Sequence, residues 1–127
     1  MIRRKKTYEI EAELFSALAH PVRLEILELL RAGEACVCHI QAMLDQRQAY
    51  VSQHLNVMRQ AGLVTNRKEG LRVYYQITDP SVLVLIDSMN TVMQSLGLWP
   101  AVAEPTMLAS TSPKECNCPQ CLSSPAS

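Results

Sequence analysis

The chain has 127 residues, of which 48% are hydrophobic and 19% are charged, which is the size and composition of one globular domain with a modest core. Twelve basic and twelve acidic residues cancel, so net charge alone gives no argument for nucleic-acid binding. No apolar run approaches the ~20 residues that cross a bilayer, and the basic start lacks the apolar segment of a signal peptide. A cytoplasmic protein with no membrane partner is expected.

The charges are unevenly distributed along the chain. Residues 1–78 contain eleven Lys and Arg against eight Asp and Glu, whereas residues 79–127 contain one Lys against four acids. Any surface that binds DNA is therefore expected in the first two-thirds of the chain.

The amino-terminal part predicts a basic arm followed by two helices. Residues 1–6 are mostly basic, and we expect them to be mobile. Apolar residues lie on one face of a helix over 7–18, with acids near its start. Pro21 is well placed as the first residue of a second helix that continues over 22–31.

Two further helices follow in close succession. The pattern predicts a short helix over 36–44, then Asp45 as a cap, then a helix that begins near residue 47 and stops at Gly62. The last helix has one apolar face, and its opposite face is polar, which indicates either an ordinary solvated helix or a helix that reads a DNA major groove. The residues expected to contact DNA from it are Gln48, Tyr50, Ser52, Gln53, His54, Asn56 and Arg59.

A β-hairpin after this helix favours the DNA interpretation. Strands are predicted over 63–67 and 73–78, joined by a turn at 68–72. Two short helices followed by a basic hairpin are typical of a winged helix-turn-helix. We expect Arg67, Lys68 and Arg72 to reach phosphates or an adjacent minor groove, although hairpin tips are often polar without any such role.

The last predicted helix starts at Asp79-Pro80 and carries an apolar stripe for about four turns. The stripe either packs inside the monomer or pairs with its copy in a second subunit, and a two-fold DNA reader favours a homodimer through this helix and the first one. The expected fold is mainly α with a small β-hairpin. It comprises a DNA-binding and dimerisation domain at 1–97 and a flexible tail at 98–127, rich in Pro and Ser.

Five cysteines fall into two clusters, Cys36 with Cys38, and Cys116 with Cys118 and Cys121. Because the cytosol keeps thiols reduced, we expect a role other than structural disulfides. Two thiolates separated by one residue at a helix start are close enough to chelate one soft ion. Two ligands are too few for a complete site, so the sequence leaves the remaining ligands open.

Residues from about 12 to 97 resemble the ArsR/SmtB family of metal-responsive winged-helix repressors. The resemblance is carried by Ala-His-Pro-Val-Arg-Leu-Glu-Ile-Leu at 19–27, Ala-Cys-Val-Cys-His-Ile at 35–40, Val-Ser-Gln-His-Leu at 51–55, Ala-Gly-Leu-Val at 61–64 and Gly-Leu-Arg-Val-Tyr-Tyr at 70–75. It implies a dimeric repressor that binds double-stranded operator DNA without metal and releases it when metal binds. It also places the histidine at position 54 in the DNA-reading helix.

The same resemblance bears on the choice of metal. The arsenic-sensing branch often has a third Cys three positions after Cys-Val-Cys, where this chain has Gln41. The family's second metal site uses acids and histidines on the long helix, where only Asp79 and Asp87 occur here, so a dedicated zinc or nickel sensor is disfavoured. As(III) is the favoured inducer, followed by Cd(II) and Pb(II), with Zn(II) possible.

Several ligand sets remain open at this point. In the leading model Cys36 and Cys38 join at least one of the three tail cysteines, from either subunit. Alternatively, Cys116, Cys118 and Cys121 form a three-thiolate site by themselves, or four thiolates form a tetrahedral site that favours Cd(II) or Zn(II). A tail that only scavenges metal is a further alternative.

Two other classes of function are weighed against metal sensing. A thiol redox or reactive-sulfur switch would keep the fold and the operator but change the inducer. An enzyme has little support, because the sequence offers no nucleophile–base pattern and no Gly-rich phosphate loop.

Overall fold

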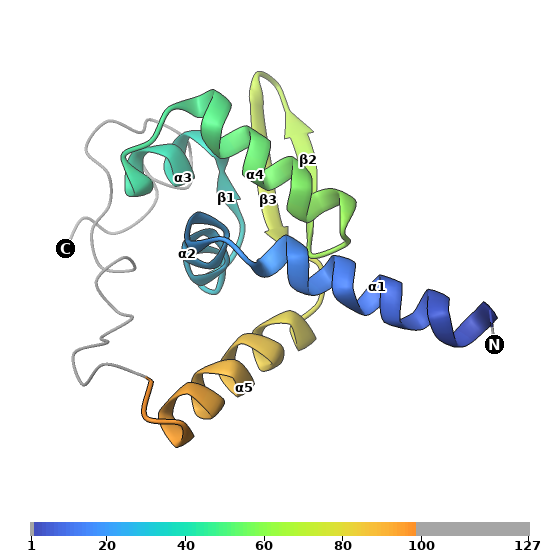
Figure 1. Cartoon of the computed structure of the whole chain (residues 1–127). Coiled ribbons are helices and arrows are strands. Elements are labelled where there is room, and N and C mark those ends of the chain that lie inside the picture. The colour runs from blue at the N-terminus through green and yellow to red at the C-terminus, as the bar shows by residue number, and fades with distance from the viewer. Residues whose placement is uncertain (1, 99–127) are drawn as a thin grey trace.

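The computed structural model describes residues 2–98, with side chains from Lys6 onward, as five helices around a small three-stranded sheet (Figure 1). In chain order the elements are α1 (Ile2–Leu18), α2 (Pro21–Leu30), β1 (Ala35–Cys36), α3 (Val37–Leu44), α4 (Gln48–Gln60), β2 (Val64–Glu69), β3 (Arg72–Ile77) and α5 (Ser81–Ser95). The predicted fold class is confirmed. The predicted tail lies outside the described residues, apart from Leu98.

Helix α1 projects away from the body of the molecule (Figure 1). It begins at Ile2, so the prediction of a mobile arm before a helix at residue 7 was wrong. Among the described side chains of this helix, from Lys6 onward, only Ala17 and Leu18 at its end are buried. There Arg23 of α2 donates from Nη1 to the carbonyl oxygens of Ser16 and Ala17, at 3.1 and 3.2 Å. These bonds satisfy carbonyls that a helix end leaves without partners inside the helix.

Helix α2 starts where the sequence predicts it. Pro21 occupies the first turn, and the preceding His20 accepts a hydrogen bond at Nδ1 from the amide of Val22, at 3.1 Å. This is a side-chain cap on an otherwise orphan N–H group. Ile26 and Leu27 are fully buried, so α2 forms the centre of the core.

Helices α3 and α4 form the helix-turn-helix. Their core side chains, Ile40, Val51, Leu55 and Met58, are fully buried against α2 and the sheet. Burying each such side chain stabilises a fold by roughly 1.5–3 kcal/mol. The apolar spacing that predicts α4 is therefore the spacing of its core face.

The connection between these helices corrects one prediction. Asp45 does not cap α4. It closes α3 in the left-handed conformation, with φ of 52°, and its amide bonds back to the carbonyl of Ala42. The residue before α4 is Arg47, whose side chain makes no capping hydrogen bond.

The sheet is antiparallel with the order β1-β3-β2. The hairpin of β2 and β3 is the predicted wing, but its turn consists only of Gly70 and Leu71, so the five-residue turn predicted at 68–72 was too long. Gly70 has φ of 61°, and glycine at the first position of a two-residue turn fits the twist of antiparallel strands. The short strand β1 was not predicted, and it joins the cysteine-bearing segment to the wing.

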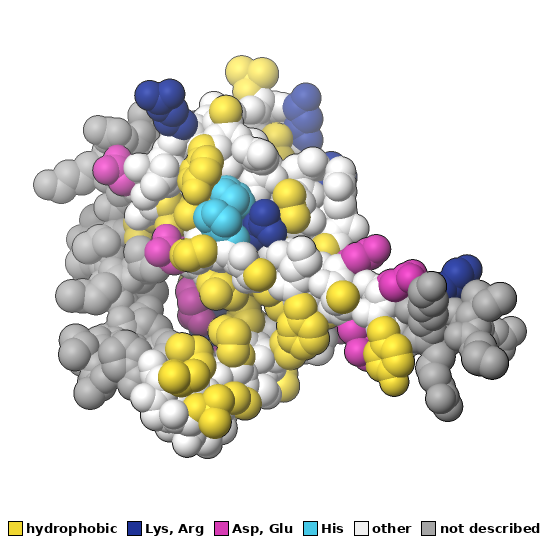
Figure 2. Space-filling model, in the orientation of Figure 1, with side chains coloured by type: hydrophobic (Ala, Val, Ile, Leu, Met, Phe, Trp, Pro, Cys, Tyr) yellow, Lys and Arg dark blue, Asp and Glu magenta, His cyan; other side chains and the backbone are white. Residues whose placement is uncertain are grey.

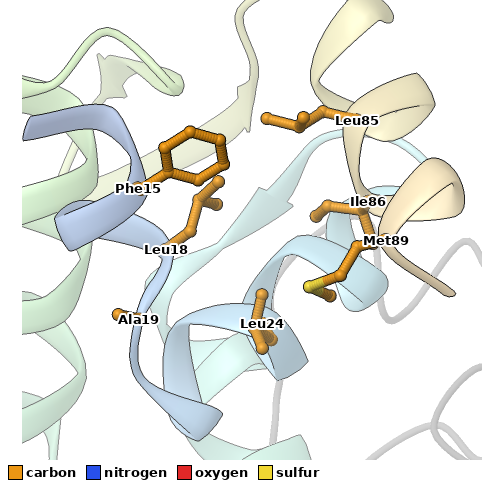
Figure 3. Close-up of a pocket in the computed structure, with 7 residues that line it drawn as sticks. All are labelled: Phe15, Leu18, Ala19, Leu24, Leu85, Ile86 and Met89. Atoms are coloured by element: carbon orange, nitrogen blue, oxygen red, sulfur yellow. The ribbon is translucent and has the colours of Figure 1, made fainter. Parts of the chain in front are cut away.

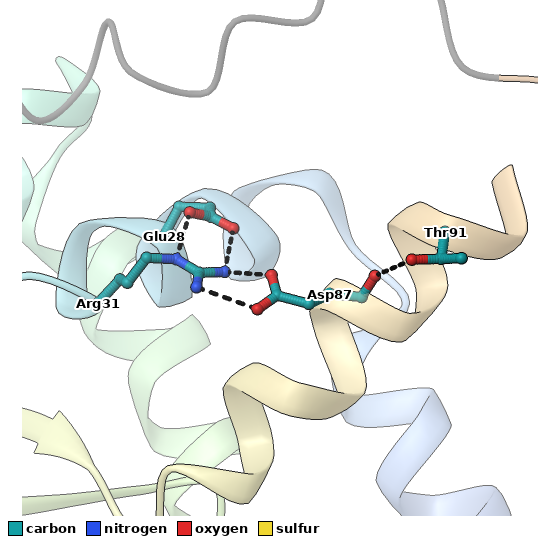
Figure 4. A network of polar contacts seen from close by, with 4 residues as sticks. All are labelled: Glu28, Arg31, Asp87 and Thr91. Atoms are coloured by element: carbon teal, nitrogen blue, oxygen red, sulfur yellow. Dashed lines mark hydrogen bonds and ion pairs between the residues drawn. The ribbon is translucent and has the colours of Figure 1, made fainter. Parts of the chain in front are cut away.

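Helix α5 follows the sheet and lies below α2 in the view of Figure 1. Ile86 enters the core, and Arg31 at the end of α2 bonds both Glu28 and Asp87, with Nη2 to Asp87 Oδ1 at 2.7 Å (Figure 4). This guanidinium lowers the pKa of the Asp87 carboxyl, chiefly through the hydrogen bond. Asp79 accepts from the amide of Ser81 at 3.1 Å. Both acids of this segment therefore have structural partners.

No helix in the described part of the chain is long and apolar enough to span a membrane.

Candidate DNA interface and thiol site

The polar face of α4 lies at the surface. Gln48, Tyr50, Gln53, Asn56 and Arg59 are exposed, and Ser52 is half-buried. The side chains between them, Val51, Leu55 and Met58, anchor the opposite face in the core. The helix therefore presents amides, a hydroxyl and a guanidinium on a rigid support, which is the donor and acceptor set that base edges in a major groove require.

Two residues of this face are already oriented toward each other. Arg59 donates from Nη2 to the side-chain oxygen of Asn56 at 2.6 Å. The pair lies one helical turn apart, where side chains at i and i+3 meet. The hydrogen bond fixes both side chains before any contact with DNA.

His54 differs from the other residues predicted to contact DNA, because it is 6% exposed and lies beneath the polar face. Its Nδ1 accepts from Nε of Arg23 at 3.1 Å, and its ring packs against His20 and edge-on against Tyr50. Its Nε2 is buried without a hydrogen-bond partner among the described residues. Burial lowers the pKa of His54, and the nearby His20 and Arg23 lower it further. The imidazole of His54 therefore links α4 to α2 beneath the polar face.

The three basic residues of the wing also divide into two kinds. Lys68 and Arg72 are exposed beside the turn, and Figure 2 shows Lys and Arg side chains at the wing end of the molecule. Arg67 instead binds two carboxylates, those of Glu34 and Glu69, and these bonds raise its pKa. Its charge is therefore compensated within the protein.

The cysteine pair lies where the sheet meets the helix-turn-helix. Cys36 is the last residue of β1 and the N-cap of α3, and its sulfur accepts from the amide of His39 at 3.2 Å. The structure joins Cys36 and Cys38 in a disulfide, with their Cα atoms 5.3 Å apart. This bond is of the kind that the redox alternative requires, and the expected metal-binding role of the pair stays a prediction. Cys36 is 1% exposed, and it packs against Tyr74 together with Cys38.

The described residues do not form a complete metal site. Two sulfurs at one helix start suit a thiophilic ion, but the described part of the chain contains no group of three His, Cys, Asp or Glu residues that could hold a metal. His39, which follows the pair, is half-buried, and burial lowers its pKa. Cys116, Cys118 and Cys121 lie outside the described residues.

An apolar groove runs between α1, α2 and α5. It encloses about 360 Å³ and is lined by Phe15, Leu18, Ala19, Leu24, Leu85, Ile86 and Met89 (Figure 3). Phe15 is 60% exposed and Val92 of α5 is 53% exposed. Figure 2 shows hydrophobic side chains gathered over α1 and α5. The apolar stripe predicted on the last helix is therefore only partly covered within the described monomer.

Sequence analysis did not identify Glu34, Tyr74 or Arg23. Glu34 precedes a strand too short to give a periodic pattern, and Tyr74 alternates with Val73 and Tyr75 and so shares the opposite strand face with Gln76. Arg23 lies in a helix whose apolar pattern gives no sign of its partner 31 residues away. The only available signal was an acid two residues before the Cys-Val-Cys motif, and its partner Arg67 is 33 residues distant.

Comparison with known proteins agrees with this architecture. The model of the family described as bacterial regulatory proteins of the arsR family matches residues 20–66. An uncharacterized HTH-type transcriptional regulator of Methanocaldococcus jannaschii is 45% identical over 80 residues, which are 62% of this chain and 90% of the relative. The arsenical resistance operon repressor of Escherichia coli is 40% identical over 73 residues, covering 57% of this chain and 62% of the repressor.

A solved structure gives the same result at the level of the fold. The homodimeric winged helix-turn-helix domain of a possible ArsR-family regulator from Mycobacterium bovis is 29% identical, with a TM-score of 0.70. The match covers 80% of this chain and 94% of that domain. The likeness extends over the helix-turn-helix, the wing and the flanking helices.

Proposed function

Because this chain belongs to the ArsR family of bacterial transcriptional regulators, we propose that it is a homodimeric repressor whose affinity for operator DNA is set by thiol chemistry at Cys36 and Cys38. The observation that carries this proposal is the position of Cys36, which ends a strand paired with the wing and also starts the helix-turn-helix. The relatives are described as regulators and repressors, in agreement with the expectation that the chain is not an enzyme. The proposed compartment is the cytoplasm.

In this proposal α4 enters the major groove and the wing contacts the backbone beside it. Gln48, Gln53 and Ser52 are the first candidates for base contacts, with Tyr50, Asn56 and Arg59 behind them. Lys68 and Arg72 are positioned for phosphates. We assign His54 to support of the reading helix and Arg67 to support of the wing, because each side chain binds another side chain of the protein.

The groove between α1 and α5 is the proposed dimer interface. A partly exposed apolar stripe on two helices is typical of a surface that a second copy covers. The homodimeric state of the M. bovis domain supports this assignment. Two-fold pairing would place two copies of α4 on half-sites about one DNA turn apart.

The leading inducer is a thiophilic ion, with As(III) first, then Cd(II) and Pb(II), and Zn(II) as a further possibility. Cys36 and Cys38 would supply two thiolates, and at least one of Cys116, Cys118 and Cys121 would complete the site, from the same or the partner subunit. The similarity to the E. coli arsenical resistance operon repressor supports the choice of arsenic. Thiolate ligands favour such ions over Mg(II) or Ca(II).

The disulfide between Cys36 and Cys38 favours a second candidate, a redox switch. Two thiols would transfer two electrons and two protons to a peroxide, which is reduced to two molecules of water as the sulfur–sulfur bond forms. This alternative needs no ligand from the tail. It uses the same fold, the same operator and the same two cysteines.

The test is fluorescence anisotropy of the reduced full-length protein on the DNA upstream of its own gene. Sodium arsenite, Cd(II), Pb(II) and Zn(II) are titrated in parallel with hydrogen peroxide. Release at near-stoichiometric arsenite or Cd(II) supports the metal proposal, and release by peroxide alone replaces it with the redox switch. Failure of every agent to change affinity contradicts thiol control.

Two sets of serine variants locate the ligands. Cys36→Ser and Cys38→Ser are each expected to bind the operator and to lose release by either class of agent. A triple variant with Cys116, Cys118 and Cys121 changed to Ser is expected to lose release by arsenite but to keep release by peroxide. If both single variants still release the operator with arsenite, the metal site lies in the tail alone.

A further inference from the structure

Three side chains form a row across the sheet. In the antiparallel register, Cys36 of β1 is directly opposite Tyr74 of β3, and Tyr74 is directly opposite Arg67 of β2. Residues directly opposite each other in such a sheet lie on the same face and are close neighbours. The row therefore runs from the cysteine pair to the wing in two steps.

Each step of the row is a packed contact. Cys36 and Tyr74 are 1% and 3% exposed and pack together. The guanidinium carbon of Arg67 lies 4.5 Å from the centre of the Tyr74 ring, a distance at which the cation is attracted by the face of the ring. Because the two buried residues are closely packed, a displacement of Cys36 cannot be absorbed without moving Tyr74.

Glu34 closes the row into a ring. Its two oxygens accept from Nε and Nη2 of Arg67, both at 2.7 Å, which is a bidentate pair with fixed geometry. Glu34 lies two residues before Cys36, so the segment that carries the thiol also holds the wing by a second route. The hydrogen bonds from Arg67 lower the pKa of the Glu34 carboxyl.

The outer part of β2 has few other attachments. In β2 only Val64 is buried, and every later residue of the strand is exposed. The hairpin is held at its base by Val64 and Tyr75, which enter the core, and beyond its base by the pairing with β1 and the ring of contacts around Tyr74. The strand β1 has only two residues, follows Glu34 and ends at Cys36. A change at Cys36 can therefore alter how β1 pairs with the wing.

We propose that Glu34, Arg67 and Tyr74 are positioning residues that transmit the chemical state of Cys36 to the wing, an inference that rests on the proposed thiol control of operator binding. Chemistry at Cys36 reorients β1, and Glu34 directly precedes β1. Glu34 then draws Arg67 and the hairpin away from the position that fits DNA. A rival route would run through α3 into the core face of α4, without involving Glu34.

Two variants separate these routes. Glu34→Gln removes the charge and one of the two acceptor oxygens from the bidentate pair that joins the thiol segment to the wing. Glu69→Gln is the matched control, because Glu69 also binds Arg67 but belongs to the wing itself. Each substitution removes one negative charge beside the same guanidinium, so both change the electrostatic attraction to DNA in the same direction.

The measured quantity is the ratio of operator affinities of the reduced protein before and after treatment with arsenite or peroxide. Allosteric coupling is commonly about 5- to 150-fold, and we expect a ratio of about 10-fold or more for the wild type and for Glu69→Gln. For Glu34→Gln the ratio should fall to about 2-fold or less, since the wing no longer follows β1. A full ratio in Glu34→Gln overturns the inference and favours the route through α3.

Amide hydrogen exchange of residues 65–69, measured without DNA, gives a second readout. Treatment should speed exchange in the wild type and in Glu69→Gln, and should leave Glu34→Gln unchanged. If the wild type itself shows no change in affinity with any agent, the proposed function fails, and the inferred coupling fails with it. A responsive wild type with an equally responsive Glu34→Gln contradicts only the coupling.

Discussion

Arg23 donates from Nε to Nδ1 of His54 over 3.1 Å, and this hydrogen bond ties α2 to the middle of the recognition helix. It requires an unprotonated Nδ1, and burial lowers the pKa of His54 below its usual value. The unfolded chain, with a pKa of about 6.5, then takes up a proton where the native state does not. The free energy of unfolding should therefore be constant above about pH 7.5 and fall below pH 6.5, by up to about 1.4 kcal/mol per pH unit.

Urea unfolding from pH 8 to pH 5, at fixed protein concentration, measures this dependence. His54→Asn keeps an acceptor oxygen for Arg23 and removes the titrating group, so its profile should be flatter. His39→Gln is needed beside it, because burial lowers the pKa of His39 as well and gives a contribution of the same sign. If the free energy of unfolding of His54→Asn depends on pH as steeply as that of the wild type, another group is responsible for the pH dependence.

Loss of a base contact and loss of a phosphate contact should affect DNA affinity differently. The first should depend on the DNA sequence, and the second should depend on the salt concentration. Gln53→Ala, on the exposed face of α4, is expected to weaken specific binding by about 1–3 kcal/mol without changing the slope of log affinity against log salt. Lys68→Ala, beside the wing turn, should weaken binding to all sequences similarly and reduce that slope by about 1. Equal effects of the two variants on specific and random DNA would contradict the assignment of α4 as the reading helix.

Dimerisation through α5 can be tested by introducing a negative charge at either of two nearby positions of the helix. Val92→Glu places a carboxylate in the apolar stripe, whereas Gln94→Glu adds the same charge about 200° away around the helix. The dimer dissociation constant, measured by sedimentation equilibrium, should rise about 10-fold or more for Val92→Glu, because the partner would bury an unpaired charge. The dimer dissociation constant of Gln94→Glu should equal that of the wild type. A raised dissociation constant in both variants would indicate an interface that extends beyond the apolar stripe.

The left-handed residue between α3 and α4 offers a stabilising substitution. Asp45 has φ of 52°, a conformation that costs a non-glycine residue roughly 1–2 kcal/mol. Asp45→Gly should raise the free energy of unfolding by up to about 1 kcal/mol, after allowance for the greater freedom of glycine in the unfolded chain. Thermal unfolding checks this change, and a loss of stability would mean that the carboxylate makes a larger contribution than its backbone strain.

The sequence was most informative where periodicity and local signals coincide. Val51, Leu55 and Met58 predict both the existence of α4 and its buried face, and Pro21 predicts the start of α2. The wing followed from alternation at Val73 and Tyr75, although its turn was drawn too long. Each of these features depends on residues within a few positions of one another.

Features that depend on distant partners could not be predicted. The strand β1 has only two residues and exists because β3 pairs with it. His54 has the spacing of a residue beside the polar face, yet packing against His20 and Arg23 turns it inward. Arg67 looks like a free phosphate ligand until Glu34 is brought beside it by the fold.

The position of Cys36 at the junction of sheet and helix-turn-helix has a consequence for its own chemistry, because linkage is reciprocal. If forming the disulfide weakens operator binding tenfold, then operator DNA must favour the dithiol form by the same free energy. For a two-electron couple this raises the reduction potential by about 30 mV. The promoter-bound protein would thus be harder to oxidise than the free protein, and the DNA itself would set the threshold at which the cysteines respond.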